Sequence, residues 1–296
     1  MLPATFPTNT NLRRCNTVRA AGALIIIPTF DHASTLGWAI ASAQAQSHAD
    51  CRIVVIGDGV NDDTRDVMVP LLRADARLAF VDKPKSIRHG EEYRHEVILA
   101  SSEPVIGYLG DDDLLFPQHL EMMIEVLQGN DFVNPLPVLI NPDASLTRFD
   151  TDLALPESIA WHRGRSFHRN YVSLTGVVHT RESYERLPFG WRTAPKGRWS
   201  DHFMWEQYFS LAGFRGATAA RPTTAKFASS QRQERSAEGR EKEIHDFWLA
   251  MQQPGFEQTW EQRVQDAHLI RYQNYRSWKL TAPLRFVNGR SKRNRA

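Results

Sequence analysis

The sequence predicts an α/β fold, in which helices cover both faces of a mostly parallel β-sheet and a helical extension follows at the C-terminus. From residue 23 to about 140, short apolar runs rich in β-branched residues alternate with segments of helical period. Residues 237–280 are charged and helix-favouring, and their large apolar residues indicate two helices that fold back on the domain. The strands predicted for the sheet are 24–27, 52–56, 78–81, 105–109 and 132–140.

Two helices are clearly delimited between these strands. The first follows Ser34 and Thr35, which are suited to cap it, and has apolar residues at i, i+3, i+4 and i+7, namely Leu36, Ala39, Ile40 and Ala43. The second follows the fourth strand. Pro117 suits its first turn and Gly129 its end, and its apolar stripe is formed by Leu120, Met123, Ile124 and Leu127.

The pattern loosens from about residue 141 to 235, where Pro, Arg and aromatic residues are frequent. A strand at 174–179 and a helix that opens near Ser200 or Asp201 are the elements predicted there. We therefore expect an N-terminal extension (1–22), one domain with two halves (23–128 and 129–235) and a C-terminal helical extension with a basic tail (236–296).

The amino-acid composition excludes several classes of protein. Of the 296 residues, 42% are hydrophobic and 24% are charged, which excludes disordered, collagen-like and coiled-coil chains. Lys and Arg number 36 against 34 Asp and Glu, so the net charge of +2 gives no electrostatic reason to expect a nucleic-acid partner. The two cysteines, Cys15 and Cys51, cannot form a disulfide framework or a four-ligand zinc site. Small substrates are the expectation.

The sequence also predicts a cytoplasmic protein. No apolar run approaches the roughly 20 residues that a membrane span needs, and the first one, at 23–27, comes too late and is too short for a signal peptide. Residues 285–296 hold five Lys or Arg and no acid. Such a tail is typical of a solvated terminus, and the alternative is peripheral contact with an anionic membrane.

Three consecutive carboxylates, Asp111, Asp112 and Asp113, follow the buried strand 105–109 and precede a helix. Neighbouring carboxylates repel one another, and this repulsion grows where the dielectric is low, so a cation or hydrogen-bond donors must compensate. Ligands of open parallel sheets bind outside the carboxyl ends of the strands, and oxygen ligands favour Mg²⁺ or Mn²⁺. The run therefore predicts a metal site, with an acidic turn that caps the helix as the alternative.

Two further strand ends carry polar or special residues. The second predicted strand ends in a turn in which Asp58 stands between two glycines, and the first ends at Pro28. Asp58 is suited to accept a hydrogen bond from a base or a ribose, or else is a plain turn residue. Asp62 breaks the pattern of a dinucleotide-binding fingerprint, and no phosphate-binding P-loop occurs. Because parallel strands end at one edge of a sheet, we expect these residues to lie together.

Three segments resemble the nucleotide-sugar-binding half of the GT-A glycosyltransferases of family 2: IIIPTF, IVVIGDGVNDDT and VIGYLGDDDLLFPQHLE. The resemblance covers roughly residues 23–215. It implies a GT-A fold, with a nucleotide-binding half at 23–128 and an acceptor half at 129–235. It also implies an inverting, Mn²⁺- or Mg²⁺-dependent transfer from a nucleoside diphosphate sugar, commonly of uridine, to a saccharide or lipid-linked acceptor, as in the assembly of cell-surface polysaccharide or glycolipid.

On the donor side, the resemblance implies roles for five positions. The base would lie among Pro28, Thr29 and Phe30, and Asp58 would contact it. Asp111 would lie near the ribose.

At the reacting end, Asp112 and Asp113 would hold the metal ion at the diphosphate. The segment 197–203 resembles the one that carries the general base of the family, which makes Asp201 the candidate for that role. The chain departs from the family pattern at Gly110, where many members have Asp, and at His95, where many have Asn after the Arg. A single carboxylate base with no enzyme nucleophile implies one displacement with inversion.

Some residues keep two interpretations. His179 would reach the metal or a phosphate, or it is a satisfied strand-end histidine. Lys83, Arg88 and Arg94 would neutralise phosphate, or they lie on the solvated surface. Two alternative functions are a nucleotidyltransferase that makes nucleotide sugars, whose expected Gly-rich basic loop is missing after the first strand, and a catalytically silent nucleotide-sugar-binding module.

Overall fold

The structure of the chain is a computed structural model that describes residues 22–163 and 171–274. Most of the predicted N-terminal extension and the basic tail with its membrane contact lie outside the described residues, as does Cys15. None of the helices in the described ranges is long and apolar enough to cross a membrane.

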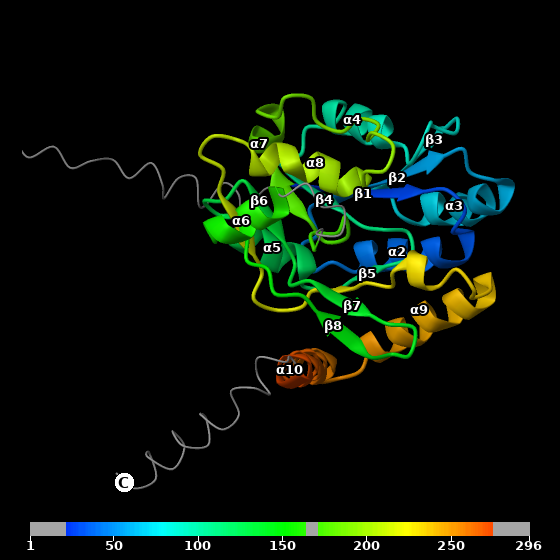
Figure 1. The fold of residues 1–296 in the computed structure, drawn as a ribbon. Coiled ribbons are helices and arrows are strands. Elements are labelled where there is room, and N and C mark those ends of the chain that lie inside the picture. The colour runs from blue at the N-terminus through cyan, green and yellow to red at the C-terminus, as the bar shows by residue number, and fades with distance from the viewer. Residues whose placement is uncertain (1–21, 164–170, 275–296) are drawn as a thin grey trace, which may run out of the picture.

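A seven-stranded sheet with the order β10-β6-β9-β4-β1-β2-β3 forms the centre of the molecule (Figure 1). All neighbouring strands in it are parallel except β9, which runs antiparallel to both β4 and β6. The predicted mostly parallel sheet is confirmed. Its strands are β1 (Ala23–Thr29), β2 (Cys51–Asp58), β3 (Leu78–Lys83), β4 (Val105–Tyr108), β6 (Phe132–Asn134), β9 (Val178–Thr180) and β10 (Gly216–Thr218).

Two small antiparallel sheets lie beside it. One pairs β5 (Leu114–Leu115) with β11 (Thr224–Ala225), and the other is a hairpin of β7 (Val138–Ile140) and β8 (Leu146–Arg148). The first of these brings the segment after the acidic run next to residues more than 100 positions away in the chain.

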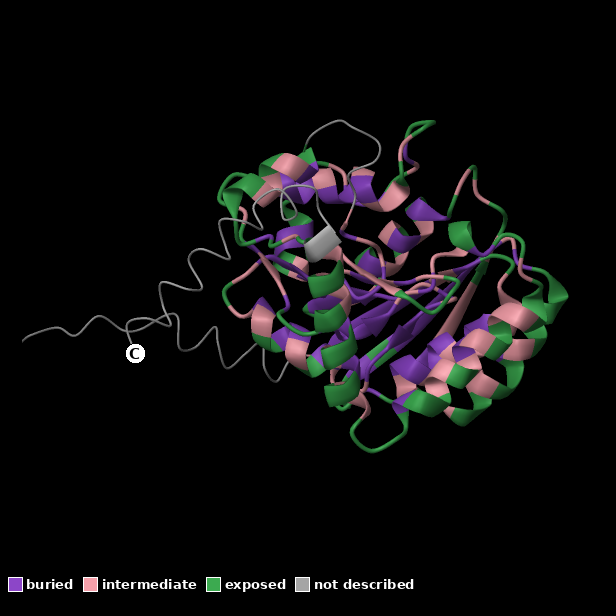
Figure 2. Ribbon diagram, turned by 60° about the horizontal axis from the view of Figure 1, so that its bottom comes forward, coloured by how far each residue is buried: buried purple, intermediate pink, exposed green. Residues whose placement is uncertain are grey.

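Helices cover both faces of the central sheet. On one face lie α2 (Ala33–Gln44), α3 (Asp62–Ala74) and α5 (His119–Leu127), and on the other lie α4 (Glu91–Leu99), α7 (Arg181–Glu185) and α8 (Ser200–Phe209) (Figure 1). Alternate residues of β1 feed the two cores: Ile25 packs on the side of α2, and Ile26 on the side of α4 and α8. Since both faces are covered, the central strands are buried almost throughout, which explains their continuous apolar sequence (Figure 2).

The C-terminal helices pack against the domain rather than standing apart from it. These are α9 (Ala237–Met251), which lies along α2, and α10 (Phe256–Asn274), which lies along β8. Together with β5 and the hairpin they enclose a third apolar core, in which Phe116 contacts Phe247 and Trp260. The remaining helices are α6 (Pro156–Arg163) and a short 3₁₀ turn, Ser229–Gln231.

The prediction of one strand over 132–140 is wrong. Pro135 and Pro137 lack the N–H that a ladder needs, so β6 stays in the central sheet and β7 leaves it for the hairpin. The strand predicted at 174–179 is also shorter, because Gly176 has a left-handed φ of 82° and β9 begins only after it.

Candidate functional site

The carboxyl ends of β1, β2 and β4 meet at one edge of the sheet, and a cavity of about 380 Å³ opens there. It is lined by the five residues for which the family resemblance implied contact with a donor: Pro28, Thr29, Phe30, Asp58 and Asp111. The parallel register of the strands brings these positions together, since each directly ends or follows one strand. We call this space the donor cavity.

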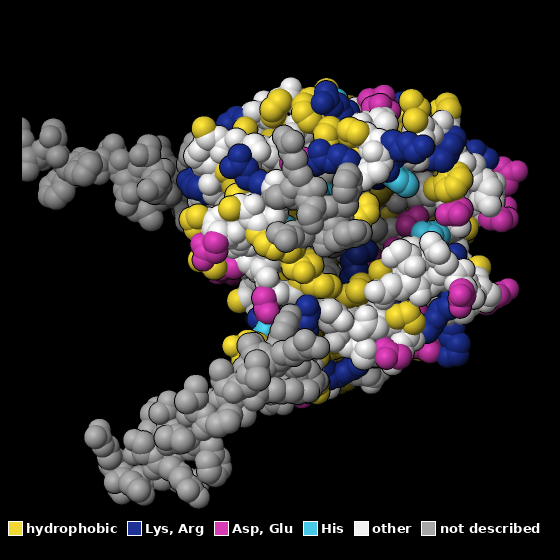
Figure 3. Space-filling model, viewed as in Figure 1, with side chains coloured by type: hydrophobic (Ala, Val, Ile, Leu, Met, Phe, Trp, Pro, Cys, Tyr) yellow, Lys and Arg dark blue, Asp and Glu magenta, His cyan; other side chains and the backbone are white. Residues whose placement is uncertain are grey.

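A second cavity of about 520 Å³ adjoins the first and is lined by Asp201 and Lys226, together with Trp191 and Trp199. The two cavities share three basic lining residues, Arg88, His89 and Arg94. Figure 3 shows the hollow on this face of the molecule, with Lys and Arg side chains gathered above it in the region of α4 and β3. We call this second space the Asp201 cavity.

Asp58 is buried, and its carboxylate orders the loop that follows β3. It accepts hydrogen bonds from Lys85 Nζ at 2.5 Å, from the Ser86 backbone N–H at 2.6 Å and from the Ser86 hydroxyl at 2.9 Å. Burial opposes ionisation of Asp58, but these donors outweigh it and lower its pKa below the usual value. Lys85 in turn lies 4.7 Å from the centre of the Phe30 ring, so this network forms one wall of the donor cavity.

Two buried polar groups of the donor cavity have no hydrogen-bond partner among the described residues. These are the hydroxyl of Thr29 at the end of β1 and the Nε and one terminal nitrogen of Arg94. The Arg94 guanidinium stacks 4.8 Å from the Trp191 ring, and burial lowers its pKa. Buried donors and acceptors are almost always paired, so these atoms indicate a polar ligand at this position.

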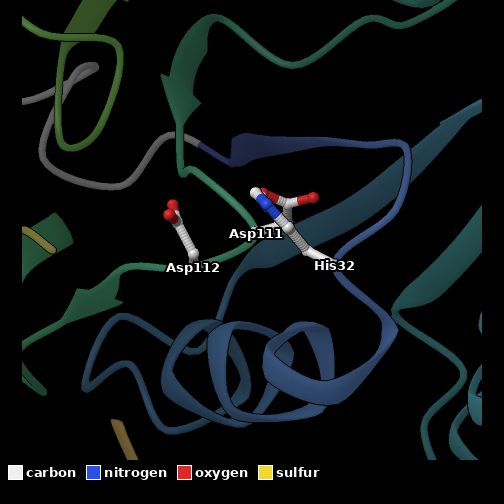
Figure 4. A group of neighbouring side chains, drawn as sticks. All are labelled: His32, Asp111 and Asp112. Atoms are coloured by element: carbon white, nitrogen blue, oxygen red, sulfur yellow. The ribbon is translucent and has the colours of Figure 1, made fainter. Parts of the chain in front are cut away.

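Each aspartate of the acidic run has different neighbours. Asp111 lies 2.9 Å from His32 Nδ1, whereas Asp112 accepts a hydrogen bond from the Ser229 hydroxyl. Ligand atoms of His32, Asp111 and Asp112 all lie within 4.8 Å of one another (Figure 4). Burial and the negative charge of Asp113 raise the pKa of Asp112 to about 6, because both disfavour the ionised form of its carboxyl group.

Asp113 is fully buried and its oxygens are engaged with the protein. Lys226 Nζ lies 2.7 Å from one oxygen and the Phe227 backbone N–H 2.7 Å from the other, while the Thr175 hydroxyl donates to the first. Although burial disfavours a charged lysine, Asp113 and Asp112 raise the pKa of Lys226 above its usual value. The assignment of Asp113 as a metal ligand stays a prediction, and these contacts favour a role in holding Lys226.

Asp201 lies in the first turn of α8 and lines the Asp201 cavity. One of its oxygens accepts a hydrogen bond from the His202 backbone N–H at 2.7 Å. Burial raises the pKa of Asp201 above the usual value for a carboxyl group. The residue as a whole is partly exposed, at the wall of the cavity.

The other predicted basic residues are divided among the core, the surface and the cavities. His179 is buried in the core, where its Nε2 lies 2.8 Å from the Tyr108 hydroxyl, and burial lowers its pKa to about 3. Lys83 forms a surface ion pair with Glu96 at 2.7 Å. Arg88 lines both cavities, where it donates to the carbonyls of two residues before α8, Ala194 and Pro195.

The sequence analysis missed His32 and Lys226. His32 follows the first strand closely, and that position was the signal available for it. The hydrogen bond with Asp111 raises the pKa of His32 to about 9. Arg240 of α9 has the opposite effect: it lies 3.1 Å from His32 Nε2 and favours a neutral ring, whose Nε2 can accept a hydrogen bond from the guanidinium. Lys226 gave no local signal, since its partner Asp113 lies 113 positions away.

Two carboxylates and an imidazole within reach of one point are suited to a divalent cation, and carboxylate ligands favour Mg²⁺ or Mn²⁺. The raised pKa of Asp112 is consistent with a site that a cation would complete. The residues present therefore fit the metal ion that the fold implies.

Two curated proteins are similar to this chain in sequence. An uncharacterised glycosyltransferase of Nostoc sp. (strain PCC 7120) is 27% identical over 57% of this chain and 55% of its own length. The succinoglycan biosynthesis protein ExoU of Rhizobium meliloti (strain 1021) is 35% identical over 37% of this chain and 31% of its own. The chain thus spans about half, or less, of the length of these curated relatives.

Among solved structures, residues 1–349 of S. aureus TarS have a similar fold, with a TM-score of 0.54 at 12% identity, over 78% of this chain and 71% of that one. The family model "Glycosyl transferase family 2" matches residues 24–183, which include β1, β2, β4 and the acidic run. This chain, with its strand ends gathered around a donor cavity, belongs to glycosyl transferase family 2.

Proposed function

We propose that this protein transfers a sugar from a nucleoside diphosphate sugar, with a UDP-sugar favoured, to a hydroxyl group of a saccharide or lipid-linked acceptor. One observation carries the proposal: the donor cavity and the Asp201 cavity share Arg88, His89 and Arg94, so a donor in one meets an acceptor in the other. The ExoU relative is named for succinoglycan biosynthesis, which supports a role in polysaccharide assembly.

The donor cavity supplies groups for each part of the nucleotide. The unpaired Thr29 hydroxyl is suited to hydrogen bond the nucleoside, and the neighbouring Phe30 ring offers an apolar surface for the base. The two unpaired nitrogens of Arg94 are suited to the diphosphate, because a guanidinium pairs well with phosphate oxygens. Asp58 is proposed to contact the base and also holds the Lys85 loop in place.

Asp112, Asp111 and His32 would hold a Mn²⁺ or Mg²⁺ ion at the diphosphate. When bound, such an ion supplies Lewis-acid stabilisation of the negative charge on the departing diphosphate. Lys226, held by Asp113 at the wall of the Asp201 cavity, adds a fixed positive charge close to the same carboxylates.

Asp201 is proposed as the general base. As the acceptor oxygen attacks the anomeric carbon, Asp201 takes the hydroxyl proton and the bond to the diphosphate breaks, which inverts the configuration in a single displacement. The raised pKa of Asp201 makes it a stronger base than an ordinary carboxylate.

Calorimetric titration of UDP with and without Mn²⁺ tests the donor site. Wild-type protein should bind UDP much more tightly with Mn²⁺, and Asp112→Ala should abolish that difference, because the ion loses a ligand. Asp143→Ala, which removes an exposed carboxylate from the turn between β7 and β8, is the matched control and should bind like wild type. Equal affinity of the native protein with and without Mn²⁺ would contradict the metal site.

A screen of nucleotide sugars for slow hydrolysis in the presence of Mn²⁺ needs no acceptor and separates an enzyme from a binding module. We expect at least one donor, a UDP-sugar first, to be hydrolysed. Tight binding of a donor with no hydrolysis of any would favour the silent binding module.

A further inference from the structure

Trp199 lines the Asp201 cavity and differs from the other described tryptophans in its exposure. It is 50% exposed, whereas Trp191, Trp205 and Trp260 are at most 2% exposed. Among the residues that the structure describes, none places a ring or a cation over the Trp199 indole, and none accepts a hydrogen bond from its Nε1. The ring therefore offers apolar surface that the folded chain does not use.

Trp199 also stands at a position that its own chemistry does not suit. It is the N-cap residue of α8, and its side chain makes no capping hydrogen bond. A cap must accept from a backbone N–H, whereas an indole N–H only donates. Side chains of Asn61, Thr180 and Ser236 do cap α3, α7 and α9. Such departures from local preference, without a structural gain, are typical of functional positions.

The backbone on both sides of Trp199 is held in place. The Ser200 hydroxyl donates a hydrogen bond to the buried carboxylate of Glu91 at 2.6 Å. On the other side, Arg198 forms an ion pair with Glu206, and its guanidinium lies 5.1 Å from the centre of the Phe203 ring. The indole is thus attached to a fixed point of the cavity wall, which lowers the entropy that a ligand loses by binding to it.

The same wall offers groups that hydrogen bond to hydroxyls. Ser173 and Ser230 line the cavity, and neither hydroxyl bonds to another described residue. Each can donate and accept, and the Asp201 carboxylate accepts. A sugar ring has an apolar C–H face and a rim of hydroxyl groups, so an exposed indole beside free hydroxyls matches its chemistry.

The cations of this wall have other partners. Arg88 donates to two backbone carbonyls before α8, and Lys226 pairs with Asp113. Arg94 is shared with the donor cavity, where its unpaired nitrogens are proposed to meet the diphosphate. Burial lowers the pKa of His89, which favours its neutral form. These groups therefore give no reason to expect an anionic acceptor.

Trp199 and Asp201 lie close together at the start of α8. Two residues of chain span at most about 7 Å, and both residues line one cavity of about 520 Å³. A single sugar unit is therefore large enough to contact both side chains.

We propose that Trp199 recognises the acceptor: its indole stacks on the C–H face of the sugar unit whose hydroxyl group lies at Asp201. This inference rests on the proposed function, because it assumes that the Asp201 cavity takes the acceptor. It narrows the acceptor from any hydroxyl compound to one whose reacting unit is a sugar ring, either free or attached to a lipid.

The test is saturation-transfer NMR of the full chain with UDP and Mg²⁺, titrated with methyl glycosides of common hexoses and with their disaccharides. Wild type should bind at least one of these sugars but not sorbitol, a linear polyol without a ring face. Trp199→Ser should weaken that binding about three- to tenfold through loss of the stacked ring, and Trp199→Phe should keep most of it. Leu249→Ala, which removes an apolar side chain of similar exposure (49%) from α9, is the matched control.

Urea unfolding separates recognition from a structural role. Serine is a good N-cap, so Trp199→Ser should unfold at the same or a higher urea concentration than wild type. A less stable Trp199→Ser, wild-type sugar affinity in that variant, or equal binding of sorbitol and sugars would overturn the inference, as would a wild type that binds none of the sugars. Metal-dependent UDP binding, measured on the same preparations, should be unchanged in the variants, and its absence from wild type would contradict the proposed function instead.

Discussion

Three adjacent aspartates of one sequence run acquire three different environments. Asp111 lies against His32, Asp112 accepts a hydrogen bond from Ser229, and the buried Asp113 pairs with Lys226 at the wall of the Asp201 cavity. Only burial and partners distinguish these identical side chains, and both come from distant segments. A carboxylate with accessible oxygens is suited to bind an ion, whereas one already paired with a lysine and a backbone N–H is suited to hold structure.

Asp201→Asn tests the general base at this scale. The amide keeps the size of the side chain but cannot accept the hydroxyl proton, so turnover should fall by about 10² to 10⁴ or more. Affinity for UDP with Mn²⁺ should stay close to wild type. Steady-state transfer rates and calorimetry measure the two effects, and a variant with wild-type turnover would remove Asp201 from this role.

The raised pKa of Asp201 also predicts the acidic limb of the pH profile. Only the deprotonated carboxylate is a base, so kcat falls as the pH drops through the pKa, and that midpoint should lie above the ordinary carboxyl value of 3.8. The measurement is kcat at saturating donor and metal, since kcat reports groups in the complex. A rate that stays constant down to pH 4 would contradict the assignment.

At the scale of elements, the turn between β2 and α3 determines the shape of the donor cavity. Gly59 in this turn has φ 71°, and a Cβ placed there would lie 2.7 Å from the Cα of Lys85 and 2.8 Å from its backbone nitrogen. The turn at Gly59 and the loop at Lys85 are therefore in backbone contact, next to the hydrogen bonds that Lys85 and Ser86 donate to Asp58. A glycine is needed here both for conformation and for space.

Gly59→Ala should therefore displace the Lys85 loop and weaken UDP binding. It should also destabilise the fold by more than the roughly 1–2 kcal/mol that an alanine in the left-handed conformation costs. Gly129→Ala is the matched control, because Gly129 has φ 81° but its Cβ would meet nothing within 4 Å. Urea unfolding and calorimetry measure both variants. Equal destabilisation of the two, with UDP affinity unchanged in both, would show that the close approach is unimportant.

At the scale of the whole molecule, three apolar cores meet around the sheet, and two of them enclose neutral histidines. His119 is held by the Thr223 hydroxyl and His179 by the Tyr108 hydroxyl, and burial lowers the pKa of each to about 3. Their unfolded value is 6.5, so between pH 6.5 and 3 the unfolded chain binds protons that the folded chain does not. Folding stability is therefore lost as the pH falls through this window.

We predict that each of these histidines removes about 1.4 kcal/mol of unfolding free energy per pH unit below 6.5. Urea unfolding between pH 7 and pH 5 measures the slope for wild type. His119→Gln should be less stable at pH 7 but should have a shallower slope by that amount. Parallel curves for the two proteins would contradict the assignment of a neutral buried histidine.

The sequence by itself determined the layered α/β architecture and the edge at which the site lies. Strand and helix periodicities are local properties, and parallel strands necessarily bring Thr29, Asp58 and Asp111 to one edge of the sheet. The local pattern also predicted a helix that opens near Ser200 or Asp201, and α8 begins at Ser200. These conclusions required only short segments of chain and the geometry of a sheet.

Tertiary structure alone decided what each side chain does there. The contacts of Asp113 with Lys226 and of Asp112 with Ser229 join residues more than 100 positions apart, and no local pattern records them. The burial of His179 likewise depends on which segments pack together. Charge and accessibility are set by burial and by partners, and burial belongs to the folded molecule rather than to any stretch of its sequence.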